Sequence, residues 1–289
     1  MEYIILAFLF IVICFIIVTC DTNRFVLKKY EFTNEKVTDT FHFILLSDLH
    51  NKSFGKENKK LLKAIDERKP DAILCAGDIL TAKPGNDFQV AARLINSLSE
   101  KYPVYYGNGN HEYRLKVYPE TYGNMAEEYE NALNNNNMFR LINESKSIKE
   151  KNIIIYGLEI EKDYYKRFHK ETMEKEYISS LLGPIRKEAC TILIGHNPEY
   201  FEQYAQYGVD FVLAGHVHGG VARIPFLGGV ISPSLRIFPK YDGGIFKIKK
   251  QDGGISTMIL SRGLGCHTIP VRFLNPGELI EITIRSEKR

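Results

Sequence analysis

Histidine, aspartate and asparagine recur along this chain in five short clusters, and four of the clusters also contain glycine. Imidazole, carboxylate and amide groups together suit borderline divalent metals such as manganese, iron or zinc. A lone histidine is usually an ordinary core or surface residue, whereas five clusters of one composition predict a shared site. The candidate ligands and proton donors are Asp48, His50, Asp78, Asn110, His111, His196, His216 and His218.

The number and type of these side chains indicate two metal ions rather than one. Seven ligands are too many for a single tetrahedral ion, and none of the five cysteines lies in a cluster, which argues against a closed structural zinc site. Two ions roughly 3.5–4 Å apart, sharing a carboxylate, could each bind a phosphoryl oxygen and hold a hydroxide between them. The scattered cysteines form no CxxC pair and no disulfide framework, which fits a reducing compartment.

Each cluster directly follows a short apolar run. Runs of this kind are typical of strands that are covered on both faces. Helical patterns over residues 58–67 and 87–98 separate them, and this alternation predicts an α/β fold. Such folds bind ligands at the carboxyl ends of their strands. The five apolar runs are Phe41–Leu46, Ala72–Cys75, Val104–Tyr106, Thr191–Ile194 and Phe211–Leu213.

Three other regions depart from this alternation. Residues 113–150 are polar, include the Asn134–Asn137 run and contain a predicted helix near 122–134, so we interpret them as a cap or insertion beside the site. Residues 161–188 are charged and are predicted to form a helical, solvated surface element. After residue 219 the chain is rich in glycine and in strand-forming residues, with Gly243-Gly244 and Gly253-Gly254 as turn signals.

The clusters resemble a known set of motifs, and they occur in the same order. The blocks Asp48-x-His50, Gly77-Asp78, Gly109-Asn110-His111-Glu112, Gly195-His196 and Gly215-His216-x-His218 are similar to the five blocks of the calcineurin-like metallophosphoesterases, over residues 43–218. The C-terminal part resembles the membrane-anchored bacterial phosphodiesterase-like subgroup. The segments that carry this second likeness are Gly219-Gly220, Ile224-Pro225-Phe226, Phe238-Pro239-Lys240-Tyr241, Ser261-Arg262-Gly263-Leu264-Gly265 and Pro270-Val271-Arg272-Phe273.

The resemblance implies a fold and a role for each residue. The fold would be a four-layer α/β/β/α sandwich of two mixed sheets flanked by helices. Asp78 would bridge the two metals. His111 would not be a ligand but would stand near the leaving-group oxygen, as a general acid or to stabilise charge on the phosphoryl group. Ligands of the first metal would be Asp48, His50 and His218, and those of the second Asn110, His196 and His216.

Two positions depart from the family pattern. Many members have an aspartate three residues after the bridging one, where it orients the catalytic histidine; this chain has Thr81. His111 must then be oriented in another way, by Glu112 or by a backbone carbonyl. Members of the subgroup often have glutamine after His-Gly-Gly, where this chain has Val221, which would alter substrate contacts.

The reaction that the resemblance implies is hydrolysis of a phosphodiester or pyrophosphate bond, including lipid-linked ones, by a metal-bridging hydroxide. Manganese is the metal expected to support activity, with iron and zinc as alternatives. Protein phosphatase activity is disfavoured because no Asp-Arg-Gly extension follows Asp78. The alternatives are a phosphomonoesterase, a hydrolase of another bond such as an amide, and a non-catalytic metal-binding scaffold.

The N-terminus predicts a membrane anchor. Tyr3–Thr19 is an unbroken apolar run, which at about 1.5 Å per helical residue just crosses a thin hydrocarbon core. A cleaved signal peptide and a lipoprotein modified at Cys20 are the alternatives. Basic residues follow the run and none precedes it, so the positive-inside rule places the remainder in the cytoplasm. We therefore predict an anchor over 1–20, a polar linker over 21–40 and one phosphoesterase domain over 41–289.

The remaining features receive weaker assignments. A formal net charge of +3 gives no reason to expect nucleic acid as a partner; the expected partners are the membrane and a small phosphoester or lipid phosphate. Arg262 could reach a phosphate or form a structural ion pair, and the segment Ile224–Leu227 is either an apolar lip near the membrane or core. Three histidines are interpreted as ordinary residues: His42, His169 and His267.

Overall fold

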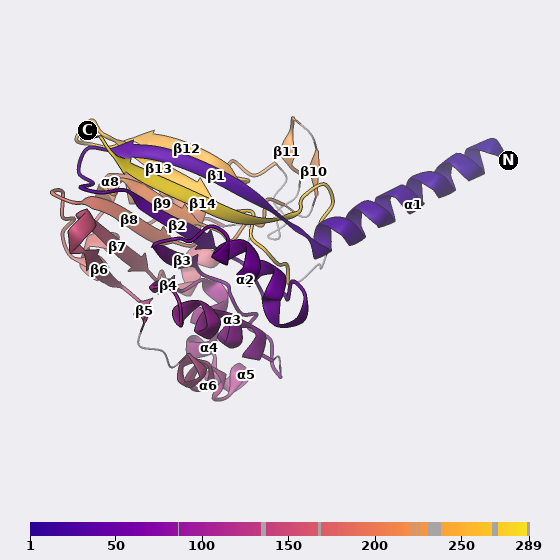
Figure 1. Ribbon diagram of the computed structural model, residues 1–289, viewed down its shortest axis with the longest axis horizontal. Helices are drawn as coiled ribbons and strands as arrows, with labels where there is room; N and C mark the ends of the chain where they lie inside the picture. Colours follow the sequence, from indigo (N-terminus) through magenta and orange to yellow (C-terminus); the bar gives the residue numbers. More distant parts are fainter. Residues whose placement is uncertain are drawn as a thin grey trace.

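A computed structural model of the chain describes residues 1–85, 87–133, 137–166, 169–220, 222–224, 226–230, 238–267 and 271–287. Two six-stranded sheets form its centre (Figure 1). In order across the first sheet, the strands are β1 (Phe25–Asn34), β14 (Gly277–Ser286), β2 (Phe41–Leu46), β3 (Ala72–Ala76), β4 (Val104–Gly107) and β5 (Met138–Leu141). Across the second they are β12 (Gly244–Lys249), β13 (Ile255–Leu260), β9 (Phe211–Ala214), β8 (Cys190–Gly195), β7 (Ile153–Leu158) and β6 (Glu144–Ile148).

The helices flank the sheets, except for one that projects away from them. A short hairpin of β10 (Arg223–Ile224) and β11 (Gly228–Gly229) stands apart from both sheets. The α-helices are α1 (Glu2–Asn23), α2 (Lys59–Asp66), α3 (Gln89–Ser99), α4 (Asn110–Val117), α5 (Pro119–Tyr122), α6 (Met125–Ala132), α7 (Tyr177–Leu182) and α8 (Phe201–Tyr207). Single 3-10 turns are η1 (Lys56–Asn58), η2 (Lys149–Lys151), η3 (Lys162–Tyr165) and η4 (Pro198–Tyr200).

Alternation of apolar side chains along the strands explains the layering. Successive strand residues point to opposite faces. In β2, Phe43 and Leu45 pack between the two sheets, whereas Ile44 packs against the helices outside the first sheet. In β8, Ile192 packs between the sheets and Leu193 packs towards α8. Helices therefore cover the outer face of each sheet, and the predicted four-layer α/β/β/α sandwich is confirmed.

Both sheets are mixed, as predicted. Strands β2 to β5 run parallel, while β14 is antiparallel to β2. In the second sheet β7, β8, β9 and β13 run parallel, with antiparallel β6 and β12 at the edges. The parallel strands of each sheet end at one edge, so the loops that follow them come together.

The segment predicted as a polar linker is largely ordered structure, and that prediction is wrong. Helix α1 continues to Asn23, and β1 pairs in parallel with β14 along its whole length. Tyr30 and Phe32 pack against the core between the sheets, while Lys28 and Glu31 are exposed. An edge strand with one solvated face has a polar average composition, which concealed the alternation.

Helix α1 projects from the sandwich (Figure 1). It has 22 residues, its most apolar window has a mean hydropathy of 3.1, and none of that window is buried. The helix is long and apolar enough to cross a membrane, and an N-terminal signal sequence would have the same character.

Two other predictions on local structure need correction. Residues 113–150 are not an insertion, because they supply β5 at the edge of the first sheet and β6 at the edge of the second. The predicted helix near 122–134 corresponds to α6, whose Tyr129 is buried in the core beneath the first sheet. Between 161 and 188 the described helical elements are only η3 and α7, and Met173 is buried. Four groups of positions named above lie outside the described residues: Asn134 to Asn136, Val221, Pro225 and Pro270.

Candidate metal centre

The predicted site residues lie in loops at the carboxyl ends of strands from both sheets. Those of the first sheet follow β2, β3 and β4, and those of the second follow β8 and β9. Five of them have a left-handed backbone, with φ between 49° and 74°. Such conformations are uncommon for residues other than glycine and cluster at functional sites. These five residues are Asp48, His50, Asp78, His216 and His218.

Glycines at two positions allow these loops to approach one another. A Cβ atom on Gly109 would collide with the Asp78 carboxylate. A Cβ atom on Gly215 would collide with the side chains of Ser47 and Asp48. Only glycine leaves this space, so Gly109 and Gly215 are part of the site's construction.

Asp48, His50 and His218 form the first group of donors, and their ligand atoms lie within 4.8 Å of one another. The Nε2 atoms of His50 and His218 are 3.2 Å apart, and His218 Nε2 is 3.6 Å from Asp48 Oδ1. Two imidazole nitrogens that share one ion at about 2.1 Å each lie roughly 3 Å apart. His218 Nδ1 faces the carbonyl oxygen of Gly265 at 3.2 Å. Donation of its proton there leaves the Nε2 lone pair for a metal.

The second group contains Asp78, His196 and His216, together with Asn110. His196 Nε2 lies 3.2 Å from Asp78 Oδ2, and His216 Nδ1 lies 2.7 Å from Asn110 Oδ1. His196 Nδ1 faces the carbonyl oxygen of Ala76 at 2.6 Å, so its proton is held on the side away from the centre. This is again the arrangement that prepares a histidine as a metal ligand.

Asp78 lies between the two groups. Its Oδ2 is 3.2 Å from His196 Nε2 and 3.8 Å from His50 Nε2, which belongs to the first group. Its Oδ1 accepts a hydrogen bond from the His111 backbone N–H at 2.8 Å. The carboxylate therefore faces both groups with one oxygen while the other oxygen is fixed by the backbone.

The donor atoms are arranged to bind cations rather than to form hydrogen bonds with one another. His196 Nε2 is buried and has no hydrogen-bond partner among the described residues. Its close polar contact is the ion pair with Asp78 Oδ2, at 3.2 Å. Buried polar atoms are nearly always paired, and an unpaired one needs an explanation such as a bound ion. Neutral imidazoles and carboxylates around one space are a donor set for divalent metals.

Burial tunes the protonation of this donor set. It lowers the pKa of His50 and of His218 well below the usual range, and the pKa of His216 to about 3. These rings are therefore neutral near pH 7, as ligands must be. Burial raises the pKa of Asp48 to about 7, so this carboxyl holds a proton part of the time until a cation replaces it.

Asp78 and His196 form an ion pair. Burial alone would raise the pKa of Asp78, but His196 and His111 outweigh it and hold that pKa well below its usual range. Burial alone would lower the pKa of His196, but the Asp78 carboxylate outweighs it and raises that pKa to about 10. The proton on His196 balances the negative charge of Asp78, and a bound cation would take over that role.

His111 is oriented by a backbone amide, which neither suggestion from the sequence anticipated. The N–H of Ala82 donates to His111 Nδ1 at 2.9 Å. The proton of the neutral ring is therefore on Nε2, which is buried with no described hydrogen-bond partner. Burial lowers the pKa of His111 to about 4. The ring is accordingly neutral and can donate one hydrogen bond from Nε2.

Glu112 does not orient the His111 ring, as the sequence suggested, but binds backbone N–H groups. Its carboxylate accepts hydrogen bonds from the backbone N–H groups of Asp78, Ile79 and Gly109, at 2.8–2.9 Å. It also accepts one from the Tyr106 hydroxyl at 2.7 Å. Glu112 thus fixes the loop that carries Asp78, and it acts on the centre through the backbone.

His267 was interpreted as an ordinary residue, and the structure places it at the site instead. Its ring centroid lies 4.6 Å from that of His50 and 4.7 Å from that of His111. His267 reaches the site because it follows β13, which is parallel to β9 and ends at the same edge of the sheet. Tyr165 was also missed; its ring lies 5.3 Å from that of His216, although its surroundings in the sequence are charged.

Asn275 is a further residue that the sequence did not reveal. Its buried side-chain amide donates to the carbonyl oxygens of His218, at 2.8 Å, and of Gly220, at 2.7 Å. Arg262 forms an ion pair with Glu278 at 2.5 Å, which supports the structural alternative for that residue.

The two other histidines lie away from the centre. His42 pairs with Glu281 at 3.1 Å, and His169 is exposed. The eight predicted site residues thus come together, and the three named as ordinary divide into two outside the site and one, His267, within it.

The chain is similar to several known proteins. The chain is 26% identical over 257 residues to the uncharacterized metallophosphoesterase YkuE of Bacillus subtilis, a match that covers 86% of this chain and 80% of that one. It is 25% identical over 265 residues to an uncharacterized metallophosphoesterase of Aquifex aeolicus, covering 90% of this chain and 92% of the relative. A solved NAD nucleotidase of Haemophilus influenzae aligns with a TM-score of 0.49 and 15% identity, over 78% of this chain and 45% of that one. The model of the calcineurin-like phosphoesterases matches residues 41–220, and the chain belongs to this family.

Proposed function

We propose that this protein is a two-metal hydrolase of phosphodiester or pyrophosphate bonds. The observation that carries the proposal is the position of Asp78, with one oxygen facing donors of both groups. A single-metal site would not need this shared carboxylate, nor seven donors from five loops.

The assignment of ligands follows the two groups. Asp78 would be shared, and the other donors would divide into Asp48, His50 and His218 for one ion and Asn110, His196 and His216 for the other. When bound, two divalent ions would supply Lewis acidity to the phosphoryl group and lower the pKa of water towards neutrality. Manganese is our proposed activating metal.

His111 would donate a hydrogen bond from Nε2 to a phosphoryl or leaving-group oxygen. Because Ala82 N–H occupies its Nδ1, the ring is neutral and stabilises developing charge more readily than it gives up a proton. Leaving groups that are stable as anions then react best. A phosphate leaving group, with its second pKa near about 6, meets this condition better than an alkoxide does. This argument favours pyrophosphate bonds among the candidate substrates.

The N-terminal helix supports a membrane-bound enzyme. We propose that α1 anchors the protein and that the remainder of the chain lies in the cytoplasm, with a lipid-linked phosphoester as substrate. A phosphomonoesterase remains the alternative enzyme. The non-catalytic alternative is less well supported, because the complete donor set and a well-oriented His111 are both retained.

Hydrolysis assays on the full chain in detergent test the proposal. We would add manganese to metal-free protein and follow release from a bis-aryl phosphate, an aryl-linked pyrophosphate and a mono-aryl phosphate, with Asp78→Asn as the matched control. We expect turnover of the first two substrates that the substitution abolishes. Bound metal without turnover of any of the three would sink the enzyme proposal, and preference for the monoester would favour a phosphomonoesterase.

A further inference from the structure

The hairpin of β10 and β11 exposes large apolar side chains. Phe226 is fully exposed, Leu227 is 66% exposed and Ile224 is 43% exposed. Of the two alternatives for this segment, the one that places it in the core is therefore wrong. Clustered apolar side chains on a surface, rimmed by polar ones, mark a place where the protein contacts a partner or a membrane.

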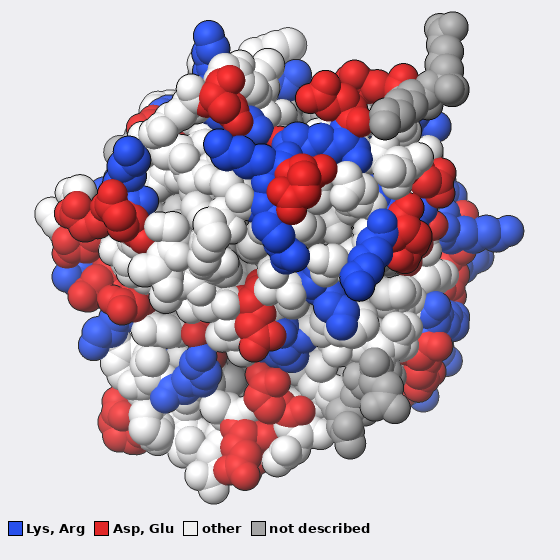
Figure 2. All heavy atoms as spheres, turned by 90° about the vertical axis from the view of Figure 1, so that its left-hand side faces the viewer, with Lys and Arg blue, Asp and Glu red and all other residues white. Residues whose placement is uncertain are grey.

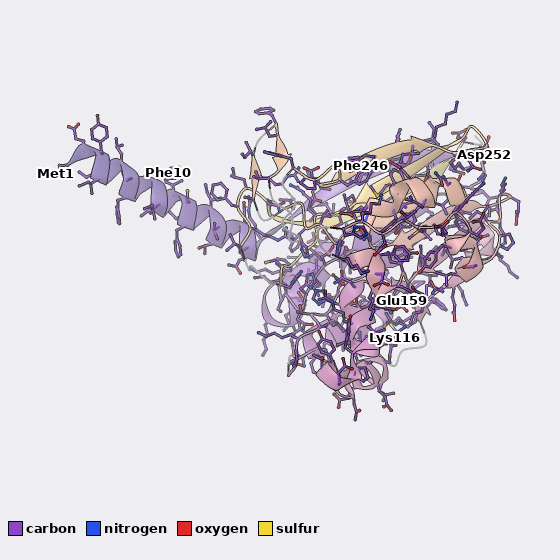
Figure 3. The ribbon with its side chains drawn as sticks, turned by 180° about the vertical axis from the view of Figure 1, so that it is seen from behind. Met1, Phe10, Lys116, Glu159, Phe246 and Asp252 are labelled. Atoms are coloured by element: carbon purple, nitrogen blue, oxygen red, sulfur yellow. The ribbon has the colours of Figure 1, made fainter. Side chains whose placement is uncertain are left out.

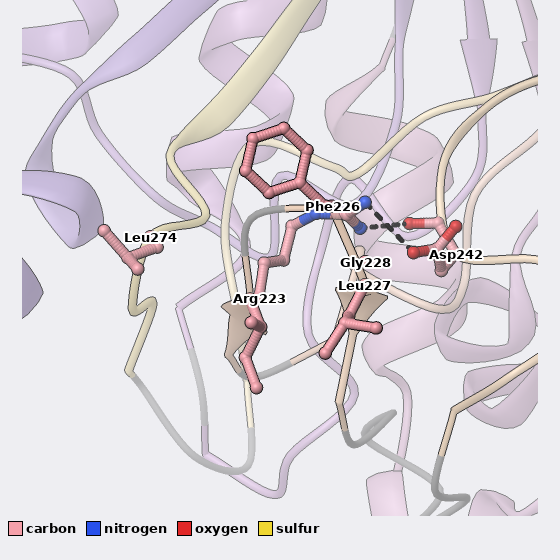
Figure 4. A pocket seen from close by; sticks show the side chains of 7 residues that line it. Arg223, Phe226, Leu227, Gly228, Asp242 and Leu274 are labelled. Atoms are coloured by element: carbon pink, nitrogen blue, oxygen red, sulfur yellow. Dashed lines mark hydrogen bonds and ion pairs between the residues drawn. The ribbon is translucent and has the colours of Figure 1, made fainter.

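A shallow hollow of about 450 Å³ joins these side chains to the next loop (Figure 4). Leu274 lines it opposite Phe226 and Leu227, and Leu274 is itself 41% exposed. The charges in the hollow cancel, because Arg223 Nη2 lies 3.0 Å from Asp242 Oδ2. The hollow therefore carries no unpaired charge, and the exposed side chains of Ile224, Phe226, Leu227 and Leu274 form an apolar surface around this ion pair.

This apolar surface is attached to the same loop as the N-terminal helix. The N–H of Arg223 in β10 donates to the carbonyl oxygen of Phe273 at 3.0 Å. Two residues along, the N–H of Asn275 donates to the carboxylate of Asp21, which is buried near the end of α1. The neighbouring N–H of Arg272 donates to the Thr22 hydroxyl.

The position of the hairpin follows from these contacts. The end of α1 and the hairpin are held side by side, and the hairpin projects from the body at the end where α1 leaves it (Figure 1). The opposite end of the molecule carries intermingled acidic and basic side chains (Figure 2).

We propose that the hairpin tip inserts into the surface of the bilayer that α1 crosses, so that Ile224, Phe226, Leu227 and Leu274 contact lipid. The proposal rests on the proposed anchoring by α1. A helix alone leaves the attached domain free to tilt, whereas a second apolar contact beside it fixes the orientation. Aromatic and aliphatic side chains on a neutral or weakly charged face are the chemistry that enters the interfacial layer.

The consequence for the site is that it is held at headgroup level. Only residues 219–222 separate the predicted ligand His218 from β10, and Asn275, which contacts Asp21, also binds the His218 carbonyl oxygen. A phosphoester whose apolar part remains in the bilayer can then reach the metal centre without leaving the membrane. The inserted hairpin thus selects lipid-linked over soluble substrates.

The absence of tryptophan from the chain allows a direct test. Phe226→Trp in the full chain, reconstituted into vesicles, reports from the hairpin alone. The matched control is Ile255→Trp, also at an exposed site (58%), at the start of β13. Ile255 lines the same hollow as Asp252, and Asp252 lies at the end of the molecule away from Met1 (Figure 3). Vesicles with brominated acyl chains quench only tryptophan that enters the lipid.

We expect emission from Phe226→Trp to shift to shorter wavelength and to be strongly quenched by the brominated lipid, and emission from Ile255→Trp to change in neither respect. Equal, water-like emission from both variants in protein that floats with the vesicles would overturn insertion while leaving the anchor intact. Protein that does not float with vesicles would overturn both. Because no turnover is measured, failure of the hydrolase proposal would not affect the result, and Asp78→Asn combined with Phe226→Trp should be quenched equally.

Discussion

Strand β9 has a buried charged cluster at each end, and the two clusters differ in how completely their atoms are paired. Before the strand, Asp210 accepts from Lys250 Nζ at 2.7 Å, from Lys36 Nζ at 2.9 Å and from the N–H of Thr191 at 3.0 Å. After the strand, in the metal centre, the buried Nε2 atom of His196 has no described hydrogen-bond partner.

This difference separates a structural cluster from a functional one. Breaking a fully paired buried cluster is strongly destabilising, because a charge is then left unpaired. A buried cluster with unpaired atoms and left-handed backbone is retained where a ligand completes it. We therefore expect the Asp210 end of the molecule to determine stability and the Asp78 end to determine metal binding and turnover.

The largest expected effect is on the activity of Asp78→Asn. The amide has the shape of the carboxylate but lacks the charge that faces both donor groups. Loss of shared metal binding removes several kcal/mol of transition-state stabilisation, which corresponds to a roughly thousandfold fall in kcat/KM. Steady-state hydrolysis of the bis-aryl phosphate measures it, with circular dichroism to show that the fold is kept. Activity within a few-fold of the wild type would remove Asp78 from the centre.

The opposite result is expected for Asp210→Asn. Lys36 and Lys250 would lose their partner, and the free energy of unfolding should fall by about 3–5 kcal/mol. Urea denaturation measures the loss, and kcat per folded molecule should not change. Glu31→Gln is the control, because it breaks an exposed pair with Arg285 and should leave stability nearly unchanged. If Asp210→Asn were as stable as the wild type but turned over more slowly, the assignment of stability to the Asp210 cluster would be wrong.

His111→Gln should lower kcat by roughly a hundredfold, the usual effect of removing one donor that stabilises developing charge. Metal content should remain that of the wild type. Because the pKa of His111 is lowered to about 4, its ring stays neutral across the assay range. The pH–rate profiles of variant and wild type should then have the same shape. An alkaline decline present only in the wild type would instead show that His111 acts as an acid.

The smallest effect concerns pH and metal affinity. Burial raises the pKa of Asp48 to about 7, so its proton must leave when a cation binds. Because Asp48 is protonated below that pH, its proton should make affinity fall as pH falls by at most about tenfold per unit, in addition to the effect of the proton that His196 releases. Manganese titrations at about pH 6 and about pH 8 measure the change. Affinity that is equal or weaker at the higher pH contradicts this assignment.

The sequence predicted which side chains come together at the candidate metal centre because the signal for their proximity is local. Each cluster follows an apolar strand, and parallel strands bring their ends together, so proximity follows from topology. The four-layer fold followed from the family motifs in the same way. The place of His267 at the site was not predicted, because it depends on β13 lying beside β9, and no local sequence pattern shows that pairing.

The sequence did not predict features that depend on backbone hydrogen bonds or on a strand's position at the edge of a sheet. The amide of Ala82 orients His111, and a backbone donor carries no signature in residue type. Strand β1 was not predicted, because its solvated face makes the composition of the segment polar on average. The buried Asp21, in a segment predicted as linker, became interpretable only through its bond to Asn275.

The central claim is that the unpaired end of β9 is completed by two metal ions. Manganese bound per chain, measured by equilibrium dialysis and elemental analysis, tests it most directly. We predict two ions per chain in the wild type and in Asp210→Asn, and fewer in Asp78→Asn. One ion or none in the wild type, or two ions retained in Asp78→Asn, would contradict the account.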